Sequence, residues 1–359
     1  MFTTRRSLIA SAAASLGMSV FHETLAQSAS TLVGVSWGGA QVDGAKAIAA
    51  EWLKGRRDYR MAWEVHEGSS SAVATKIRST WPEVKLHLCH VNDPAIHIMR
   101  REGWLESVND LPNLKDAHPR FVLRDAAGNA LAVPHYASTV CWGYRQDLVD
   151  RPIGSLEELL DPRFKGRVGL RDPSSFSGLI LVAFALEAGG DEKRIDPAFD
   201  ILARLARTGN VVNVAKGNAD VVNSLNLGES SIAMAGLAEW SVVARNHPVK
   251  LLAKLPGSRA LKSFYSLAHW AIPKSSVSAG AKDLADYFLS PERQTQYAKL
   301  IGTAPANRLA RYDDPLGALL KEDEFERFGY FCDFDYMSQN VQKWIERFDL
   351  EVRPLLRRS

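Results

Sequence analysis

Four side chains that could hold a small ligand each follow a short apolar run: Trp37, Asp93, Arg171 and Glu239. An indole face attracts a cation, and this attraction is worth about 1 kcal/mol or more once water is excluded. A guanidinium offers a bidentate fork to a carboxylate or a phosphonate. Each side chain also has a structural interpretation, as a core tryptophan, a salt bridge at the end of a strand, or a helix cap.

Ser36 suggests a different chemistry. It lies in the segment Gly34-Val35-Ser36-Trp37-Gly38, which matches the G-x-S-x-G pattern of a nucleophile elbow for acyl transfer. In α/β-hydrolases several strands precede this elbow, whereas here the expected mature chain begins only a few residues earlier. An exported serine hydrolase that uses Ser36 is therefore the alternative function, and the main expectation is a protein that is not an enzyme and has no catalytic residues.

The histidines and cysteine of residues 87–97 form a third candidate cluster: His87, Cys89, His90 and His97. Zinc takes three or four such ligands in a tetrahedral arrangement. Alternation along a strand places His87 and Cys89 on one face and His90 on the other. We therefore expect no metal site here, and we expect no cofactor.

The elements that must position these residues follow an α/β pattern, because short apolar runs alternate with helical periodicity. Strands are expected at residues 31–36, 61–65 and 85–91, and each ends in a small polar loop that opens a helix. A second block from about residue 140 repeats the pattern, with strands at 167–170 and 231–235. In open α/β sheets, ligands bind beyond the carboxyl ends of the strands, where helix N-termini present free N–H groups.

The N-terminal segment, residues 1–26, is typical of an export signal. Arg5 and Arg6 precede the apolar stretch 8–20, and residues 24–26 form a plausible cleavage site. The paired arginines favour a twin-arginine signal, and an ordinary secretory signal is the alternative. Both predict a periplasmic location, and no later apolar run is long enough to span a bilayer.

Length and composition exclude several classes of protein. A chain of 359 residues is expected to form about two domains, and 46% hydrophobic and 24% charged residues are globular values. The net charge of +3 gives no electrostatic footprint for nucleic acid. With three cysteines, an odd number, a disulfide framework is not expected.

Several segments, taken in order, resemble the extracellular solute-binding proteins of ABC importers, in the branch that includes the spermidine/putrescine-binding component. The resemblance runs from about residue 32 to residue 310. It is carried by VSWGG at 35–39, MRREGWLESV at 99–108, VPHY at 133–136, WGYR at 142–145, IGSLEELLDPRFKGRVGL at 153–170, GESSIAM at 228–234, WAIP at 270–273 and SPE at 290–292.

This resemblance implies an α/β, two-lobed periplasmic binding protein fold with a ligand cleft between the lobes. The implied first lobe comprises residues 30–137 and 267–312, the second lobe residues 138–266, and C-terminal helices residues 313–359. Strands near 134–142 and 263–268 would form the hinge. The implied partners are a small-molecule ligand and the transporter permease in the inner membrane, with no nucleic acid, and the protein is expected to be a monomer.

The resemblance also implies which loops contact the ligand, although the polyamine pattern is incomplete. Residues 264–268 carry no carboxylate, and Ala235-Gly236 replaces an expected aromatic residue. The expected solute is therefore a small polar molecule, either an amine, polyamine-like or amino-acid-like. The predicted ligand-binding residues are Trp37, Gly38, Ser70, Asn92, Asp93, Tyr136, Arg171, Asp172, Ser175, Glu239 and Tyr265.

Overall fold

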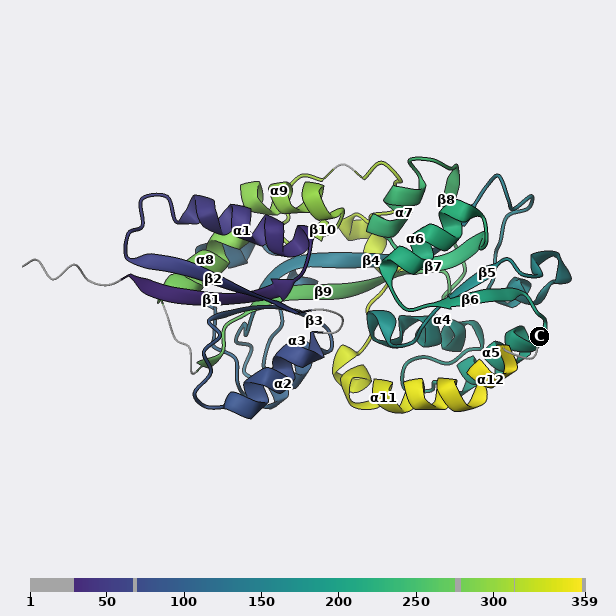
Figure 1. The fold of residues 1–359 in the computed structure, drawn as a ribbon, viewed down its shortest axis with the longest axis horizontal. Coiled ribbons are helices and arrows are strands. Elements are labelled where there is room, and N and C mark those ends of the chain that lie inside the picture. The colour runs from purple at the N-terminus through teal and green to yellow at the C-terminus, as the bar shows by residue number, and fades with distance from the viewer. Residues whose placement is uncertain (1–28, 67–69, 275–278, 313, 357–359) are drawn as a thin grey trace, which may run out of the picture.

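The computed structural model describes residues 29–66, 70–274, 279–312 and 314–356. The export signal expected at residues 1–26 lies outside the described residues. Two α/β lobes share one mixed β-sheet (Figure 1), with the strand order β2-β1-β3-β9-β4-β7-β5-β6. The α/β class predicted from the alternation of strands and helices is confirmed.

The first lobe is built on three parallel strands, β1 (Ser30–Trp37), β2 (Tyr59–His66) and β3 (Leu88–Asn92). Strand β1 lies between the other two and is mostly buried from Leu32 onward, as expected for a strand covered on both faces. The strands predicted at 31–36 and 61–65 correspond to β1 and β2, and the strand predicted at 85–91 corresponds to β3, which begins three residues later than predicted.

Helices cover both faces of this lobe. Helices α1 (Ala40–Trp52), α8 (Ala279–Leu289) and α9 (Pro291–Ile301) lie on one face, and α2 (Ser71–Thr80) and α3 (Ala95–Arg101) lie on the other (Figure 1). Each presents an apolar face at helical spacing. In α1 the buried apolar side chains are Val42, Ala45, Ile48, Ala49 and Trp52.

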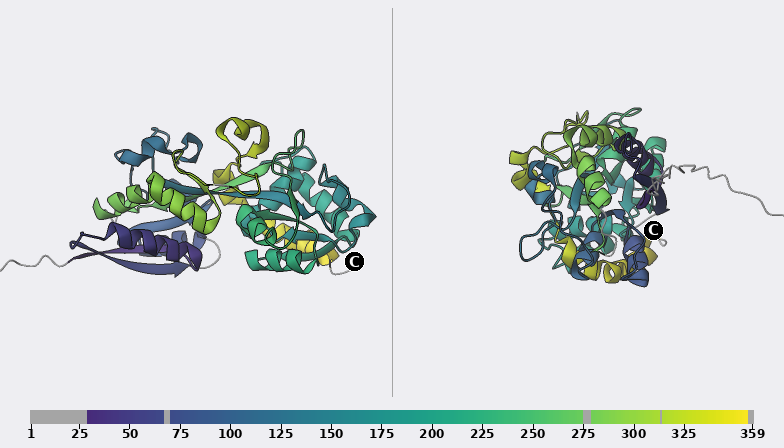
Figure 2. Two further views of the ribbon diagram at one scale, coloured as in Figure 1. Left: turned by 90° about the horizontal axis from the view of Figure 1, so that it is seen from above. Right: turned by 90° about the vertical axis from the view of Figure 1, so that its left-hand side faces the viewer.

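Two long antiparallel strands run through the middle of the molecule, β4 (Val133–Arg145) and β9 (Ser263–Ala271). The first half of β4 pairs with β9, which in turn pairs with β3 of the first lobe. The second half of β4 pairs with β7 of the second lobe. These strands therefore connect the lobes (Figures 1 and 2), and their role as a hinge stays a prediction.

The second lobe continues the sheet with β7 (Ile232–Gly236), β5 (Val168–Arg171) and β6 (Val211–Ala215), which are parallel to one another. The short strand β8 (Val249–Leu251) pairs with β4. The strands predicted at 167–170 and 231–235 correspond to β5 and β7, whereas β6 was not predicted.

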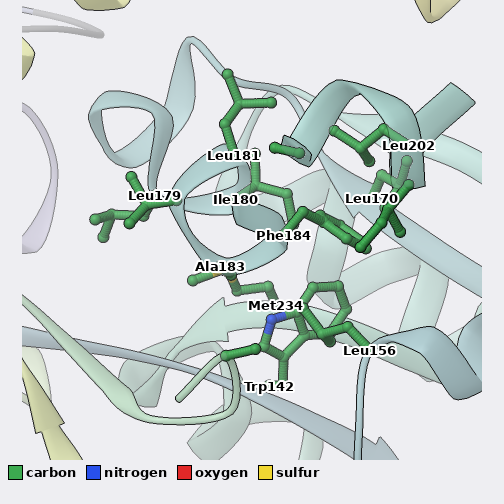
Figure 3. Packing of buried hydrophobic residues seen from close by; sticks show 14 of the residues in the cluster. Trp142, Leu156, Leu170, Leu179, Ile180, Leu181, Ala183, Phe184, Leu202 and Met234 are labelled. Carbon is green, nitrogen blue, oxygen red and sulfur yellow. The ribbon is translucent and has the colours of Figure 1, made fainter. Parts of the chain in front are cut away.

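Helices α4 (Leu179–Glu187) and α5 (Asp196–Arg207) cover one face of the second lobe, and α6 (Asn218–Leu227) and α7 (Leu237–Val243) cover the other (Figure 1). Residues 179–186 of α4 are all buried. They pack with side chains from the sheet and from α5, as Figure 3 shows for Phe184, Trp142 and Leu202. Because it is apolar all round, α4 is a core helix.

The C-terminal segment contains β10 (Ala304–Pro305), α10 (Phe325–Phe328), β11 (Gly329–Tyr330), α11 (Phe334–Glu351) and α12 (Arg353–Leu356). Helix α11 contacts α3 of the first lobe at one end and α5 of the second lobe further along. The C-terminal segment therefore bridges the two lobes on the side of α3 and α5 (Figure 1).

Candidate ligand-binding site

A cavity of about 610 Å³ lies between the two lobes, and we call it the cleft. Its walls come from the carboxyl ends of β1 and β3, from the middle of β4, and from the segments that follow β5, β6 and β7. This volume is typical of small-molecule sites. The lining residues are Trp37, Gln41, Asn92, Asp93, Tyr136, Ser138, Thr139, Arg171, Ser174–Ser177, Lys216, Gly217, Asn218, Gly236–Glu239, Ile301, Gly302 and Thr303.

Two aromatic rings, Trp37 and Tyr136, contribute to the first-lobe wall. The Trp37 ring centroid lies 4.7 Å from those of both His66 and His90, so buried rings support the indole from behind. The Tyr136 hydroxyl donates a hydrogen bond to the Gln41 Oε1 atom at 3.2 Å. Burial raises the pKa of Tyr136, which therefore stays neutral and acts as a donor. This wall offers a ligand a fixed apolar surface with a polar edge.

Two polar residues of this wall are already occupied by protein partners. The Ser70 hydroxyl donates to Asn92 Oδ1 at 2.6 Å and accepts from the Asn92 backbone N–H at 3.2 Å. The Asp93 carboxylate accepts from His97 Nε2 at 2.9 Å and from the Leu267 N–H at 2.8 Å. Ser70 therefore positions Asn92, and both carboxylate oxygens of Asp93 have protein partners before any ligand enters.

The second-lobe wall carries Arg171, at the end of β5. Its side chain is buried, its Nη2 donates to Asn218 Oδ1, and its guanidinium carbon lies 4.8 Å from the Phe176 ring centroid. Within the described part of the chain, its Nε and Nη1 atoms have no hydrogen-bond partner. Burial lowers the pKa of Arg171, and nearby acids, first among them Glu239, oppose this effect.

Glu239 lies in the first turn of α7 and is 6% exposed. Burial raises the pKa of its carboxyl group, while the charge of Arg171 and the backbone N–H groups of Glu239 and Gly236 lower it, leaving a net rise. The sequence left two roles open for Glu239, a helix cap and a residue of the binding site. Its carboxylate accepts from backbone N–H groups at the start of α7, and it also lines the cleft. Such a shifted acid in a cavity is typical of functional sites.

Between β5 and α4, the loop of residues 174–178 is held in an unusual backbone conformation. Phe176 and Ser177 have φ values of 47° and 55°, in the left-handed region that costs a non-glycine residue about 1–2 kcal/mol. Three contacts fix the loop: Ser174 Oγ to Asp172 Oδ1 at 2.6 Å, Ser175 Oγ to the Lys216 carbonyl at 2.6 Å, and Ser177 Oγ to the Asp93 carbonyl at 3.1 Å. The last contact joins the two lobes. Backbone strain of this kind often marks ligand-binding segments.

Seven predicted residues line the cleft: Trp37, Asn92, Asp93, Tyr136, Arg171, Ser175 and Glu239. The other four, Gly38, Ser70, Asp172 and Tyr265, lie outside its lining. The Asp172 carboxylate accepts from Arg353 of α12 at 2.7 Å, so it fixes the loop from behind. Tyr265 stacks on Phe331, with ring centroids 5.0 Å apart. Contact with a ligand stays a prediction for all eleven.

The register of the central strands explains the position of Tyr265. Ala268 is opposite Tyr136 and Tyr265 is opposite Thr139. Because successive side chains of a strand face opposite sides of the sheet, Tyr265 faces away from the side of Tyr136. Periodicity could have shown that Tyr265 and Ala268 differ in side. Because the adjacent residues Ser138 and Thr139 both line the cleft, the side of the strand does not by itself decide cleft contact. The stacking of Tyr265 on Phe331 takes its ring into the other cavity.

Several lining residues were missed by the sequence analysis. They are Gln41, Ser138, Thr139, Lys216, Gly217, Asn218, Ile301, Gly302 and Thr303. The segment 216–218 offered a signal, because Gly217 separates the β-branched run of β6 from α6 and so marks another strand-to-helix loop. The residues from the middle of β4 and from the end of α9 carried no such signal.

The serine-hydrolase alternative is not supported. Ser36 lies inside β1 and is fully buried, rather than on a turn between a strand and a helix. Its Oγ is 2.9 Å from His90 Nδ1, and His90 Nε2 is 3.0 Å from His135 Nδ1. Burial lowers the pKa of His135 to about 3, so the histidine at the end of this hydrogen-bonded series is neutral. A substrate has no access to the Ser36 hydroxyl. The hydrogen-bonded series Ser36–His90–His135 also ends in a histidine, where a catalytic triad has a carboxylate.

Among the described residues, no group of three or more His, Cys, Asp or Glu side chains is arranged to hold a metal ion. His87 instead accepts a hydrogen bond from the Val33 N–H at 3.0 Å, and His97 bonds Asp93. Cys89, Cys141 and Cys332 are unpaired thiols. Burial raises the pKa of Cys141 to about 12, so that thiol is protonated and unreactive at neutral pH.

Solved structures with the same architecture are two-lobed periplasmic binding proteins, and the predicted two-lobed fold is confirmed. An ABC transporter structure from Clostridium perfringens is 19% identical, with 90% of this chain and 100% of that chain covered and a TM-score of 0.72. The spermidine/putrescine substrate-binding protein PotD from Streptococcus pneumoniae is 16% identical, with 91% and 100% covered and a TM-score of 0.66. The binding protein AgtB from A. tumefaciens R10, in complex with agropinic acid, is 17% identical, with 90% and 98% covered and a TM-score of 0.65.

Residues 48–323 match the family described as bacterial extracellular solute-binding protein. This match spans most of the chain, and the protein belongs to that family. It is therefore a solute-binding protein of an ABC transporter, as the resemblance implied. No curated protein sequence matches significantly. In the portion that the structure describes, no helix is both long and apolar enough to cross a membrane.

Proposed function

We propose that this protein captures a small amino-acid-like zwitterion in the periplasm and delivers it to an inner-membrane permease. The observation that carries the proposal is the presence of Arg171 and Glu239 in one cavity, where two N–H-bearing nitrogens of Arg171 have no partner in the described part of the chain. A ligand carboxylate would accept hydrogen bonds from Arg171, and a ligand ammonium group would approach Glu239. The carbon chain between them would pack against Trp37.

Charge balance favours a zwitterion over a polyamine. A polyamine has at least two ammonium groups, and each requires an anionic or strongly polar partner once water is excluded. Both oxygens of Asp93 already accept protein hydrogen bonds, which leaves Glu239 as the acid able to serve a ligand. Arg171 and Lys216, which also line the cleft, would repel a second ammonium group. The fold does not select the ligand, since its neighbours include binders of spermidine/putrescine and of agropinic acid.

Transport by such a protein involves binding and a change of shape without a chemical step. The ligand would shift an equilibrium between open and closed lobes toward the closed form. Closure excludes water and so strengthens every charge interaction with the ligand. The proposal includes a monomer and export of the chain by the twin-arginine signal expected at residues 1–26.

A panel of ligands of defined charge tests the proposal. Purified mature protein is titrated with 4-aminobutyrate, glutamate, spermidine and butyrate by calorimetry, with thermal unfolding as a second readout, since a ligand that binds only the folded state raises its stability. We expect at least one of the two amino acids to bind more tightly than spermidine and butyrate.

The variant Arg171→Gln identifies the site. Loss of a charged hydrogen bond weakens binding by roughly 1.5–3 kcal/mol, which corresponds to about tenfold or more in Kd. The control is Arg207→Gln, which removes an exposed guanidinium of α5 in the same lobe, outside the cleft, and should leave Kd unchanged. Tighter binding of spermidine than of any amino acid would refute the zwitterion assignment.

A further inference from the structure

A second cavity, of about 270 Å³, lies on the other side of the central strands, and we call it the rear cavity. It is formed by α3, by residues 120–124, by β9 and by the segment that leads into α11. On β9 it is lined by Tyr265, Leu267 and His269, the alternate residues that face away from the side of Tyr136. The proposed transport function does not use this cavity.

Aromatic side chains form part of the wall of the rear cavity. Phe121, Tyr265, Phe331 and Phe334 all line it. The rings of Tyr265 and Phe331 are stacked with an interplanar angle of 8°, and Phe121 lies 6.4 Å from both of their centroids. Offset or edge contacts between rings at 4.5–7 Å are favourable. These rings already pack on one another, so they present a rigid aromatic wall against which the ring of a ligand could pack.

Three guanidinium groups also line this cavity. Arg100 is paired with Asp335 at 3.2 Å, and Arg120 with Glu326. Arg124 donates to the Gly128 carbonyl at 2.8 Å and, in the described ranges, makes no ion pair with a carboxylate. Arg124 is thus the cation in this wall that lacks an anion. An exposed arginine beside an apolar cavity matches a carboxylate at the mouth of the site.

Two buried histidine nitrogens give a second, independent indication of a ligand. His269 is 1% exposed, and its Nε2 lies 3.0 Å from the Phe121 carbonyl, so Nε2 carries the proton and Nδ1 is an acceptor. The Nε2 atom of His97 lies 2.9 Å from the Asp93 carboxylate. Both Nδ1 atoms are buried and have no partner among the described residues. Burial lowers the pKa of His269, in keeping with a neutral ring. A buried acceptor without a donor costs free energy, and a ligand hydroxyl could supply that donor.

We propose that the rear cavity is a second binding site, for a small aromatic carboxylate that bears a hydroxyl group. The ring packs among Phe121, Tyr265 and Phe331, the carboxylate pairs with Arg124, and the hydroxyl donates to the Nδ1 of His269. A cavity of 270 Å³ is large enough for one substituted ring and too small for the larger solutes that the cleft could take.

The two sites must be separated experimentally, because Asp93 lines both cavities. Its carboxylate is bonded by His97 on the rear side, and its carbonyl accepts from Ser177 on the cleft side. The test therefore uses one arginine variant for each cavity, Arg124→Gln for the rear cavity and Arg171→Gln for the cleft.

The probe is 4-hydroxybenzoate, titrated into the mature protein by calorimetry and followed by NMR saturation transfer. We expect one site per chain, a Kd about tenfold weaker in Arg124→Gln, and an unchanged Kd in Arg171→Gln. Arg124 is exposed, so its variant is expected to fold. Absence of binding to the wild-type protein, or loss in Arg171→Gln with none in Arg124→Gln, would overturn the proposal.

A comparison of probes tests the role of the histidine without a buried substitution. Benzoate lacks the hydroxyl, and it should bind the wild-type protein several-fold more weakly than 4-hydroxybenzoate. Equal affinity of the two probes for the wild-type protein would refute the contact with His269.

Discussion

The two walls of the cleft differ in what they leave unsatisfied. In the first lobe, Asn92 and Asp93 already have protein partners, and Trp37 is supported by buried histidine rings. In the second lobe, two nitrogens of Arg171 have no hydrogen-bond partner among the residues that the structure describes, and the adjoining loop is held at positive φ. The comparison indicates that the first lobe provides shape and the second provides charge.

This difference has a physical origin in the surroundings of each wall. The first-lobe wall is continuous with a buried aromatic cluster in which His90 stacks on Trp270, with centroids 4.3 Å apart. The second-lobe wall consists of helix starts and a loop, where N–H groups and charged side chains gather. Substitutions in the first lobe should therefore change stability and general affinity, and those in the second lobe should change selectivity.

The largest expected effect is on stability, for His90→Ala. The substitution removes a fully buried ring and leaves Ser36 and His135 without their shared partner. A cavity together with unpaired polar groups should lower the free energy of unfolding by about 3 kcal/mol or more, measured by urea denaturation. His247→Ala, outside this cluster, is the control and should change stability little. If His90→Ala unfolded at the same urea concentration as the wild-type protein, the buried histidine cluster would not stabilise the first-lobe wall.

The next effect is on affinity, for Trp37→Ala. Loss of the indole face should weaken binding of every ligand that occupies the cleft by at least tenfold, about 1.4 kcal/mol, without unfolding the chain. Trp81→Ala serves as the matched control, because Trp81 is 38% exposed and lies outside the cleft. If Trp37→Ala instead changed the preference between charged and neutral ligands, the separation of shape and charge would be wrong.

A selective effect is expected for Glu239→Gln. The variant removes the partner of a ligand ammonium group and should weaken binding of the preferred amino acid by about tenfold, since a charge-assisted hydrogen bond contributes roughly 1.5 kcal/mol. The corresponding carboxylic acid without the amine should lose nothing. Calorimetry with both ligands measures this, and Glu157→Gln, on the surface of the same lobe, is the control. An equal loss for both ligands would contradict a direct contact with the ammonium group.

The smallest effect concerns pH and Asp172→Asn. Burial raises the pKa of Asp172, but the hydrogen bonds from Ser174 and the charge of Arg353 outweigh it and hold the pKa below its usual value. The stability from this group is therefore present above about pH 4 and is lost as pH falls through the lowered folded pKa. We expect Asp172→Asn to be about 1 kcal/mol less stable at pH 7.

That difference should disappear near pH 3, because protonated Asp172 and asparagine are then both neutral. Thermal unfolding as a function of pH measures it, with Asp196→Asn as the exposed control. A difference that persists unchanged at low pH would show that Asp172 stabilises the loop by its shape and not by its charge.

The sequence predicted the elements of the fold more completely than the contents of the site. The apolar spacing of α1 predicted that helix directly, because burial on one side of a helix imposes its period. The short apolar runs of β1 and β7 predicted those strands, because a strand covered on both faces is apolar throughout. Arg171 and Glu239 were found because they follow strands. Asp172 follows the same strand as Arg171, yet its side chain bonds Arg353, 181 residues away in the chain.

By itself, the sequence determined an α/β protein of the solute-binding class with polar loops at the ends of its strands, because local periodicity and the order of segments are properties of the chain alone. Only the tertiary structure decided which polar residues meet in the cleft, that Ser36 is sealed inside a strand, and that Tyr265 faces a second cavity. Those outcomes depend on strand register and on partners distant in sequence, which no local pattern records.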